Sequence, residues 1–387
     1  MRESRRARRD MQKPRICFVS ESEATYGLMV GGDASATVGG AEVQQALLAP
    51  ALQKLGYSIS FLVTDLGQPD EVVTQQGITL IKTREQYKPV TGLRDQLADV
   101  RLLFRAMSRA GADVYYQRTS ATITGIVALY CKLKRKPFVY SVASNMDLDG
   151  TTRRRLKPLH HKLYWYGLTR ASAVVVQTED QMRLLKENVG KDGVLIRSTY
   201  PLPDEGEESE RRYVLWVGSF RDVRRPEMFI ELASRLPQYE FVMVGGPWKS
   251  QESIFDEVKK TADGVENLHL IGPVPYQKVG GYFGGAKVFV NTSSVEGFPN
   301  TYLQAWSRGL PVIATFDADG LIAKHGLGRY CSSVSHLMHA VDEFMRDDAL
   351  RASIGESAIR YVREHHSTEV VAARYDELFM RLCRRKR

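Results

Sequence analysis

Glu296 lies in a short loop that joins two apolar segments of different character. Residues 287–290 before the loop are typical of a buried strand, and residues 303–309 after it have the spacing of a helix ended by glycine. The first amides of such a helix lack internal partners, and the helix dipole favours negative charge beside them. Because a carboxylate repels an anion, we expect Glu296 to contact another part of the ligand. A sugar carried on a diphosphate fits both needs, with amides for the phosphate and a carboxylate for the hydroxyls.

A second loop of the same kind contains Arg221, Arg224 and Arg225. It joins the apolar residues 213–217 to a helix that begins near Pro226, a residue suited to a first helical turn. Gly218, at the start of this loop, permits a close backbone approach. Guanidinium groups bind phosphate through two parallel hydrogen bonds, and ligands of open parallel sheets gather at the carboxyl ends of strands. The pattern therefore predicts a phosphate contact, with an exposed basic loop as the alternative.

Glycines mark three further loops. Gly39 and Gly40 open a segment with helical spacing, and the surrounding residues do not match the dinucleotide-binding pattern G-x-G-x-x-G. Gly245-Gly246-Pro247 and Gly272-Pro273-Val274 each follow an apolar run. Ordinary turns explain these glycines as well as a binding role does.

The Glu296 loop resembles the Glu-x7-Glu signature of glycosyltransferase family 4, the retaining nucleotide-sugar transferases of GT-B fold. In this chain the signature reads Glu296-x7-Gln304, so glutamine replaces the second glutamate. The resemblance extends from about residue 16 to the last helices. It implies that Arg221 and Arg224 contact the donor diphosphate, with Arg225 as the alternative for the second role, and that Glu296 orients the sugar.

The resemblance also implies the remaining site residues. Gln304 would hold the ribose hydroxyls through hydrogen bonds weaker than those of a glutamate. The backbone near Val274 would meet the base, and Gly39 and Gly40 would face the interdomain cleft. The full donor-binding set expected beside the catalytic Glu296, Arg221 and Arg224 is Gly218, Arg225, Val274, Gly297, Phe298, Pro299, Asn300, Thr301 and Gln304.

The chain departs from the family after residues 138–142, where many members carry a histidine that contacts the donor sugar. Here Ala143 is followed by Ser144 and Asn145, which supply hydrogen bonds on the acceptor side of the cleft but no proton-shuttling group. We interpret His160 and His161 as surface or packing residues.

Asp147-Leu148-Asp149 matches the Asp-x-Asp pattern that binds a divalent metal in the other large transferase fold, GT-A. Members of the GT-B class use basic groups and helix dipoles instead. We therefore interpret these aspartates as an acidic turn, and we expect neither a metal nor a cofactor besides the nucleotide-sugar substrate.

The elements that position these residues form an α/β protein, because short apolar strands alternate with helical segments throughout. A length of 387 residues favours two domains. We predict a GT-B protein with two Rossmann-like domains whose parallel sheets face a central cleft. The expected divisions are a basic disordered N-terminus (1–14), an acceptor domain (15–200), a linker (201–212), a nucleotide-sugar domain (213–365) and, by resemblance, a C-terminal helix returning to the first domain (366–387).

Composition limits the remaining classes. The net charge is +9, with basic runs that include residues 153–155 and 384–387. An anionic membrane surface or lipid-diphosphate acceptor and a merely solvated surface both explain this charge, whereas no nucleic-acid-binding motif is present. The segment 153–170 reads either as a membrane-surface helix or as a packed helix with a charged outer face.

No apolar run is long enough for a membrane span, and no signal peptide is apparent. The four scattered cysteines favour reduced thiols. We therefore expect a cytoplasmic protein, either soluble or peripheral at the inner face of the membrane.

These features predict a retaining hexosyltransferase that moves a sugar from a UDP- or GDP-linked donor to a saccharide or lipid-linked acceptor, in surface polysaccharide or glycolipid synthesis. Two alternatives stay open. One is another GT-B enzyme, such as a nucleotide-sugar epimerase. The other is a catalytically decayed scaffold that binds nucleotide sugar or glycan, suggested by Gln304 and by the missing histidine.

Overall fold

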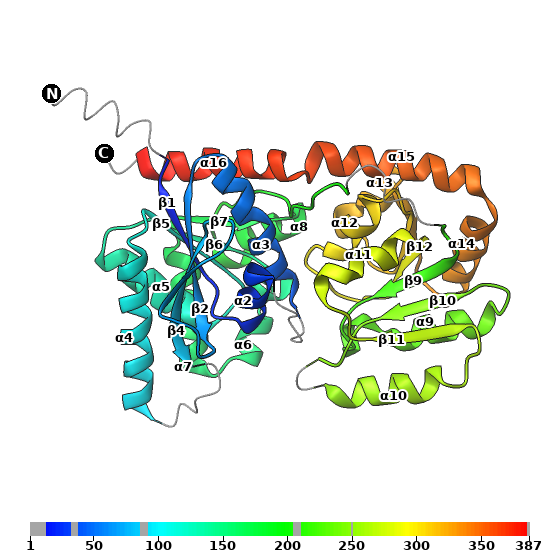
Figure 1. The fold of residues 1–387 in the computed structure, drawn as a ribbon, viewed down its shortest axis with the longest axis horizontal. Helices are drawn as coiled ribbons and strands as arrows, with labels where there is room; N and C mark the ends of the chain where they lie inside the picture. The colour runs from blue at the N-terminus through cyan, green and yellow to red at the C-terminus, as the bar shows by residue number, and fades with distance from the viewer. Residues whose placement is uncertain (1–12, 32–37, 86–91, 204–209, 249–250, 385–387) are drawn as a thin grey trace. The chain divides into compact units, whose positions relative to one another are not determined.

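The computed structural model of the protein describes residues 13–31, 38–85, 92–203, 210–248 and 251–384. These residues form two compact units, each with a largely parallel sheet covered by helices (Figure 1). Unit 1 comprises the described residues up to Arg197 together with the last helix, and unit 2 comprises Ser198–Ser367. Most of the expected basic N-terminus (1–12) and half of the expected linker (204–209) lie outside the described residues.

Unit 1 is built from eight strands and the helices between them. Its elements in chain order are β1 (Arg15–Val19), α2 (Glu23–Val30), α3 (Gly40–Lys54), β2 (Ser58–Asp65), β3 (Glu71–Val73), β4 (Thr79–Glu85), α4 (Leu93–Ala110), β5 (Val114–Arg118), α5 (Thr122–Leu133), β6 (Phe138–Ser141), η1 (Asn145–Asp147), α6 (Thr151–Arg155), α7 (Pro158–Arg170), β7 (Ala173–Val176), α8 (Glu179–Val189), β8 (Val194–Leu195) and α16 (Thr368–Arg384).

The sheet of unit 1 has the strand order β3-β4-β2-β1-β5-β6-β7-β8, and only the β3–β4 pair is antiparallel. Alternating strand residues face two separate cores. Phe18 and Tyr116 face the helices α3 and α16, whereas Cys17 and Tyr115 face α4, α5 and α7. The last helix of the chain is thus an integral part of the first unit.

Unit 2 follows the same plan with six parallel strands in the order β11-β10-β9-β12-β13-β14. Its elements are β9 (Tyr213–Val217), η2 (Asp222–Arg224), α9 (Pro226–Arg235), β10 (Phe241–Val244), α10 (Glu252–Ala262), β11 (Leu268–Gly272), α11 (Tyr276–Gly284), β12 (Ala286–Asn291), α12 (Asn300–Trp306), β13 (Val312–Ala314), η3 (Ala318–Gly320), α13 (Leu321–His325), β14 (Gly328–Tyr330), α14 (Val334–Arg346) and α15 (Asp348–His365).

The helices of unit 2 cover both faces of its sheet. Trp216 and Val288 face a core shared with α9, α10 and α14. On the opposite face, Phe289 packs against Phe283 of α11, with ring centroids 5.3 Å apart. The helix that follows β9 (α9) therefore covers one face of the sheet. The helix that follows β12 (α12) contacts α11 and covers the other face.

One helix of unit 1 was not predicted, and one predicted helix differs from the structure. The unpredicted helix is α2, and Gly31 after it has a positive φ of 74° that closes the helix. The helix expected over 153–170 is interrupted at Leu156, and Pro158 starts a second helix in its first turn. The inner face of this second helix, α7, packs into the core through Tyr164.

Two expectations from composition have structural counterparts. None of the four cysteines forms a disulfide, and three of them are buried. Within the described residues, no helix combines the length and apolar character that crossing a membrane requires.

Candidate active site

The candidate site lies at the point where the strand order of unit 2 reverses. β9 pairs with β10 on one side and with β12 on the other, and the helices that follow β9 and β12 cover opposite faces. In open parallel sheets, ligands bind outside the carboxyl ends of the strands at such a point. The loops after β9 and β12 contain the arginines and the glutamate that the sequence singled out.

The loop after β9 is held by backbone contacts with the loop after β10. The amide of Gly218 donates to the carbonyl of Val244 at 3.0 Å, and the amide of Phe220 donates to the carbonyl of Gly246 at 3.0 Å. A Cβ at Gly245 would lie 1.7 Å from the carbonyl oxygen of Gly218, so only glycine fits there. Gly218 and Gly245 therefore allow the close approach that fixes the start of the arginine loop.

Arg224 and Glu296 form an ion pair that connects the two loops. The side chains are 15% and 11% exposed, so the pair is largely shielded from water but still reachable. Ser293 donates a hydrogen bond from its hydroxyl to the same carboxylate oxygen of Glu296 at 2.9 Å. The structure thus brings together the two residues that the sequence assigned to the diphosphate and to the sugar.

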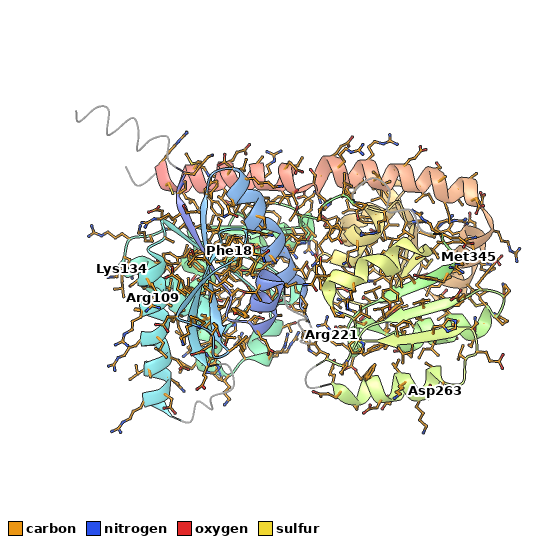
Figure 2. The ribbon with its side chains drawn as sticks, viewed as in Figure 1. Phe18, Arg109, Lys134, Arg221, Asp263 and Met345 are labelled. Carbon is orange, nitrogen blue, oxygen red and sulfur yellow. The ribbon has the colours of Figure 1, made fainter. Side chains whose placement is uncertain are left out.

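Arg221 sits one turn before Arg224, and its guanidinium lies over the ring of Trp248, 4.4 Å from the ring centroid. Figure 2 shows Arg221 at the edge of unit 2 where β9 ends. Stacking on an aromatic ring restrains a guanidinium without removing its charge. No pattern in the sequence pointed to Trp248, because an isolated tryptophan in a loop has no distinguishing neighbours.

Arg225, which the sequence allowed as an alternative for the diphosphate contact, forms hydrogen bonds with neighbouring loops. Its Nε donates to the carbonyl of Thr292 at 2.7 Å, and its Nη2 donates to the hydroxyl of Thr315 at 2.7 Å and to the carbonyl of Ser293 at 3.3 Å. Its backbone has a φ of 46°, a left-handed conformation that is uncommon for a residue other than glycine. Arg225 therefore braces the loops after β9, β12 and β13.

Small polar residues after β12 complete this brace, and sequence analysis missed them. The hydroxyl of Thr292 accepts from Nε1 of Trp216 at 3.1 Å and donates to the carbonyl of Arg224 at 2.6 Å. The amide of Ser294 donates to the carbonyl of Val223 at 2.8 Å. The run of threonine and serines directly after a buried strand was the available signal.

The helix after the second loop begins earlier than predicted. Residues 303–309 were expected to be helical, but α12 spans Asn300–Trp306. Asn300 and Thr301 thus form its first turn, and Gly297 and Phe298 precede it. The Oγ1 atom of Thr301 is sealed from solvent and has no hydrogen-bond partner within the described part of the chain.

The other predicted donor-site residues of this loop have mixed surroundings. Phe298 is buried, and its ring stacks on His366 with centroids 5.1 Å apart. Pro299 carries no amide hydrogen to donate. Gln304 is buried in α12, where its side chain hydrogen-bonds with the hydroxyl of Tyr276.

Burial and nearby charges alter the pKa of Tyr302, which lies in α12. The pKa of Tyr302 is raised well above its usual value, first by burial and then by the negative charges of Glu296 and Asp317. Its hydroxyl donates to the carbonyl of Phe316 at 2.5 Å. Tyr302 therefore remains neutral and lies beside Glu296 as an uncharged side chain.

Val274, the residue predicted to meet the base, lies at the carboxyl end of β11, one strand beyond β10.

The residues predicted for the acceptor side all lie in unit 1. Gly39 precedes α3, and Gly40 is its first residue. Ser144 caps η1 through a hydrogen bond from the amide of Met146 at 3.3 Å, and Nδ2 of Asn145 donates to Asp180 at 2.7 Å.

Both aspartates of the Asp-x-Asp pattern accept hydrogen bonds from nearby backbone amides. Asp147 is buried and accepts hydrogen bonds from the amides of Ala143 and Ser144 at 2.8 and 3.3 Å. Burial raises the pKa of Asp147, and these hydrogen bonds oppose the rise. Asp149 accepts from the amide of Thr151 at 2.8 Å. No cluster of three potential metal ligands occurs within the residues described.

Comparisons with known proteins agree with this architecture. Residues 39–197 match a family model described as a glycosyl transferase 4-like domain, and residues 211–347 match a model described as glycosyl transferases group 1. D-inositol 3-phosphate glycosyltransferases of Mycobacterium tuberculosis and Mycobacterium bovis are 23% identical over 197 residues. That match covers 43% of this chain and only 41% of the length of those relatives.

Solved structures are similar over nearly the whole chain. A sucrose-phosphate synthase from Thermosynechococcus elongatus has a TM-score of 0.73 at 17% identity, covering 96% of this chain and 99% of its own. Anabaena HepE, solved with UDP and glucose, has a TM-score of 0.73 at 14% identity, covering 95% and 99%. The fold is therefore GT-B, and the chain belongs to glycosyltransferase family 4.

Proposed function

We propose that this protein transfers a hexose from a UDP- or GDP-linked donor to a saccharide or lipid-linked acceptor with retention of anomeric configuration. The observation that carries the proposal is the Arg224–Glu296 ion pair at the strand-order reversal of unit 2. A cation for phosphate oxygens and a carboxylate for sugar hydroxyls are held side by side there. A plain nucleotide-binding site has no need of the carboxylate.

The proposed chemistry assigns charge stabilisation to the arginines. As the bond between the anomeric carbon and the diphosphate breaks, the electron pair leaves with the diphosphate, and Arg221 and Arg224 stabilise the growing negative charge. Amides at the start of α12 assist them. The acceptor hydroxyl oxygen bonds to the anomeric carbon on the face that the diphosphate leaves, and its proton passes to the departing phosphate oxygen. Because the guanidiniums supply the positive charge, this scheme needs no metal ion. Glu296 orients the hexose through its hydroxyls.

The names of similar proteins support the substrate class. HepE was solved with UDP and glucose, and a Staphylococcus aureus TarM variant was solved with UDP and a GlcNAc-glycerol. These neighbours are 14% and 11% identical, so they suggest rather than determine a UDP-linked donor for this chain. We extend the proposal to surface polysaccharide or glycolipid synthesis in the cytoplasm.

An anionic membrane surface is part of the same proposal. On α7, Leu159 is 61% exposed, and Arg153, Arg154, Arg155 and Lys157 immediately before it are exposed as well. Apolar and basic groups on one exposed segment suit a peripheral contact with acidic lipid headgroups. Sedimentation with vesicles containing phosphatidylglycerol, compared with pure phosphatidylcholine vesicles, tests this contact.

A donor-turnover experiment tests the proposal. The protein is incubated with a panel of UDP- and GDP-hexoses, with and without saccharide acceptors, and released nucleotide is measured. We expect one donor to be consumed, slowly by hydrolysis without acceptor and faster with one. Arg224→Gln should remove this turnover, whereas Arg360→Gln, which changes an exposed arginine on α15, should retain it.

The same experiment addresses the alternatives. Binding of a nucleotide sugar without turnover under every condition would favour a decayed scaffold, and conversion of one nucleotide sugar into its epimer would favour an epimerase. Gln304 and the absence of a histidine at Ala143 are the features that make a decayed scaffold the stronger of the two.

A further inference from the structure

Arg118 is a buried arginine at the carboxyl end of β5 in unit 1. It retains only 8% of its surface, and its Nε is sealed from solvent with no hydrogen-bond partner among the described residues. Within the described ranges of the chain, its side chain makes no ion pair and no hydrogen bond. Glu21, the acidic residue that follows β1, pairs with Arg84 instead.

An arginine in this position is costly for the folded protein. A guanidinium stays protonated at all physiological pH values, so it cannot lose its charge as a buried lysine can. A buried charge without a partner is strongly unfavourable, and proteins normally pair it. Thr119, the next residue, has a φ of 80°, a conformation that is uncommon for a threonine. A largely buried cation that no described residue pairs, next to a strained backbone, favours a binding role.

The surroundings of Arg118 are polar and rich in groups suited to a ligand. Arg118 pairs with Ser141 of β6 in the sheet, and Gln177 donates to the hydroxyl of Ser141 at 3.2 Å. The positive charge of Arg118 reaches the hydroxyl of Tyr375 on α16. The Oε1 atom of Gln177 is sealed from solvent, and no group in the described part of the chain donates to it.

The neighbouring strand adds a second orphaned acceptor. Val19 pairs with Gln117, so Ser20 follows β1 beside Arg118. The hydroxyl of Ser20 accepts from Nε2 of Gln45 at 3.3 Å, and Oε1 of Gln45 has no partner among the described residues. A buried cation flanked by free acceptors matches a ligand that carries both an anion and hydroxyl groups.

The topology of unit 1 places Arg118 and its polar neighbours where open parallel sheets bind ligands. β1 pairs with β2 on one side and with β5 on the other, so the strand order reverses between β1 and β5. Arg118 and Ser20 lie at the carboxyl ends of these two strands. This is the position in unit 1 that Arg224 and Glu296 occupy in unit 2, and it is where open α/β sheets bind ligands.

We propose that Arg118 binds an anionic oxygen group, a carboxylate or a phosphate, on the acceptor saccharide, with Gln177 and Gln45 accepting from its hydroxyls. This inference rests on the proposed function in one respect only, that the ligand of unit 1 is the acceptor. It assigns to the acceptor a chemical class, an acidic sugar or a sugar phosphate.

The test compares matched anionic and neutral probes on the full-length protein by isothermal titration calorimetry at constant ionic strength. Methyl glucuronide is compared with methyl glucoside, and glycerol 3-phosphate is compared with glycerol. We expect at least one anionic probe to bind about tenfold tighter or more than its neutral partner, a difference of about 1.4 kcal/mol. The pair that shows the preference identifies the carboxylate or the phosphate. Equal binding within both pairs would overturn the inference.

Two variants assign the preference to this residue. Arg118→Gln should abolish the preference, and Arg105→Gln, which changes an exposed arginine on α4, should leave it intact. Arg118→Lys keeps the charge but not the two-pronged geometry, so it should bind the anionic probe with intermediate affinity. It also serves if the glutamine variant does not fold. A preference that persists unchanged in both variants of Arg118 would also refute the inference.

Donor hydrolysis without acceptor separates the two proposals. It is measured on the unaltered protein, because it needs the donor residues of unit 2 and no acceptor bound in unit 1. Donor turnover without anion preference would leave the proposed function standing and refute the role of Arg118. Anion preference without donor turnover would do the reverse.

Discussion

At the scale of single residues, the contact between Arg224 and Glu296 sets the electrostatics of the donor site. Each side chain neutralises the other in the unliganded protein, and each is needed by a different part of the donor. A donor diphosphate must therefore compete with Glu296 for the guanidinium, or share it. This competition makes the two residues separable by experiment.

Glu296→Gln should lower the transfer rate while tightening the binding of UDP or GDP. The neutral amide forms weaker hydrogen bonds with the hexose, so we expect a rate loss of about tenfold or more. Arg224 loses its counter-charge in this variant and becomes more available to the diphosphate. Rates and calorimetric affinities measured side by side check this, with Glu257→Gln on α10 as an exposed control. A normal transfer rate would show that Glu296 does not touch the sugar.

Arg225→Met should destabilise unit 2 by at least about 1.5 kcal/mol, the low end for a hydrogen bond to a charged group. The variant loses three hydrogen bonds that brace three loops. Arg235→Met is the matched control, because Arg235 makes a single exposed pair with Glu231 whose contribution is only about 0.3–0.5 kcal/mol. Urea unfolding measures both. Equal stabilities of the two variants would contradict the bracing role.

The sequence placed three arginines in the loop after β9 but did not predict which contacts each of them makes. Arg221, Arg224 and Arg225 carry the same chemical group, and their directions depend on backbone turns that spacing does not reveal. The hydrogen bonds of Arg225 to Thr292, Ser293 and Thr315 distinguish it from the other two arginines, and nothing in the local pattern signals them. Arg118 escaped notice for a similar reason, because a lone arginine after a strand carries no motif.

At the scale of elements, strands were predicted closely and helix starts less so. Continuous apolar runs such as residues 213–217 and 287–290 coincide with the buried strands β9 and β12 because both faces of these sheets are covered. The start of α12 was placed three residues late, since the polar Asn300 and Thr301 hid its first turn. The break between α6 and α7 follows from Pro158, which was visible in the sequence.

The crossing of α5 and α7 offers a test at this scale. A Cβ at Gly125 would lie 2.1 Å from the carbonyl oxygen of Leu163, so Gly125→Ala must push the helices apart and should cost about 1–3 kcal/mol. Gly281→Ala on α11 is the control, because a Cβ there meets nothing within 4 Å. It should stabilise the protein by about 0.5–1 kcal/mol. Thermal unfolding gives both values, and tolerance of Gly125→Ala would disprove the close crossing.

At the scale of the whole molecule, the chain passes from unit 1 to unit 2 and returns in its last helix. Asp376 on α16 holds that helix to the rest of unit 1 through Lys13 and through the hydroxyl of Tyr57 at 2.5 Å. Burial alone would raise the pKa of Asp376, but these two partners hold it below its usual value.

This pKa predicts an acid-sensitive attachment of α16. Because the folded protein binds the proton less readily than the unfolded chain, the stabilisation is complete above the unfolded pKa of about 3.9 and is lost as the pH falls further. The stability difference between the unaltered protein and Asp376→Asn should therefore be largest from about pH 5 upward and shrink below about pH 4. Urea unfolding across this range measures it. A difference independent of pH would exclude the ionised form as the cause.

Both units place charged or polar groups at the strand ends where their sheets reverse order, and in unit 2 that arrangement underlies the proposed function. Its most direct test is the affinity for a nucleoside diphosphate relative to the bare nucleoside, measured with UDP and uridine and with GDP and guanosine. The account predicts a preference for one diphosphate of about tenfold or more, lost in Arg224→Gln and kept in Arg360→Gln. Equal affinity for diphosphate and nucleoside, or a preference that survives the loss of Arg224, would contradict it.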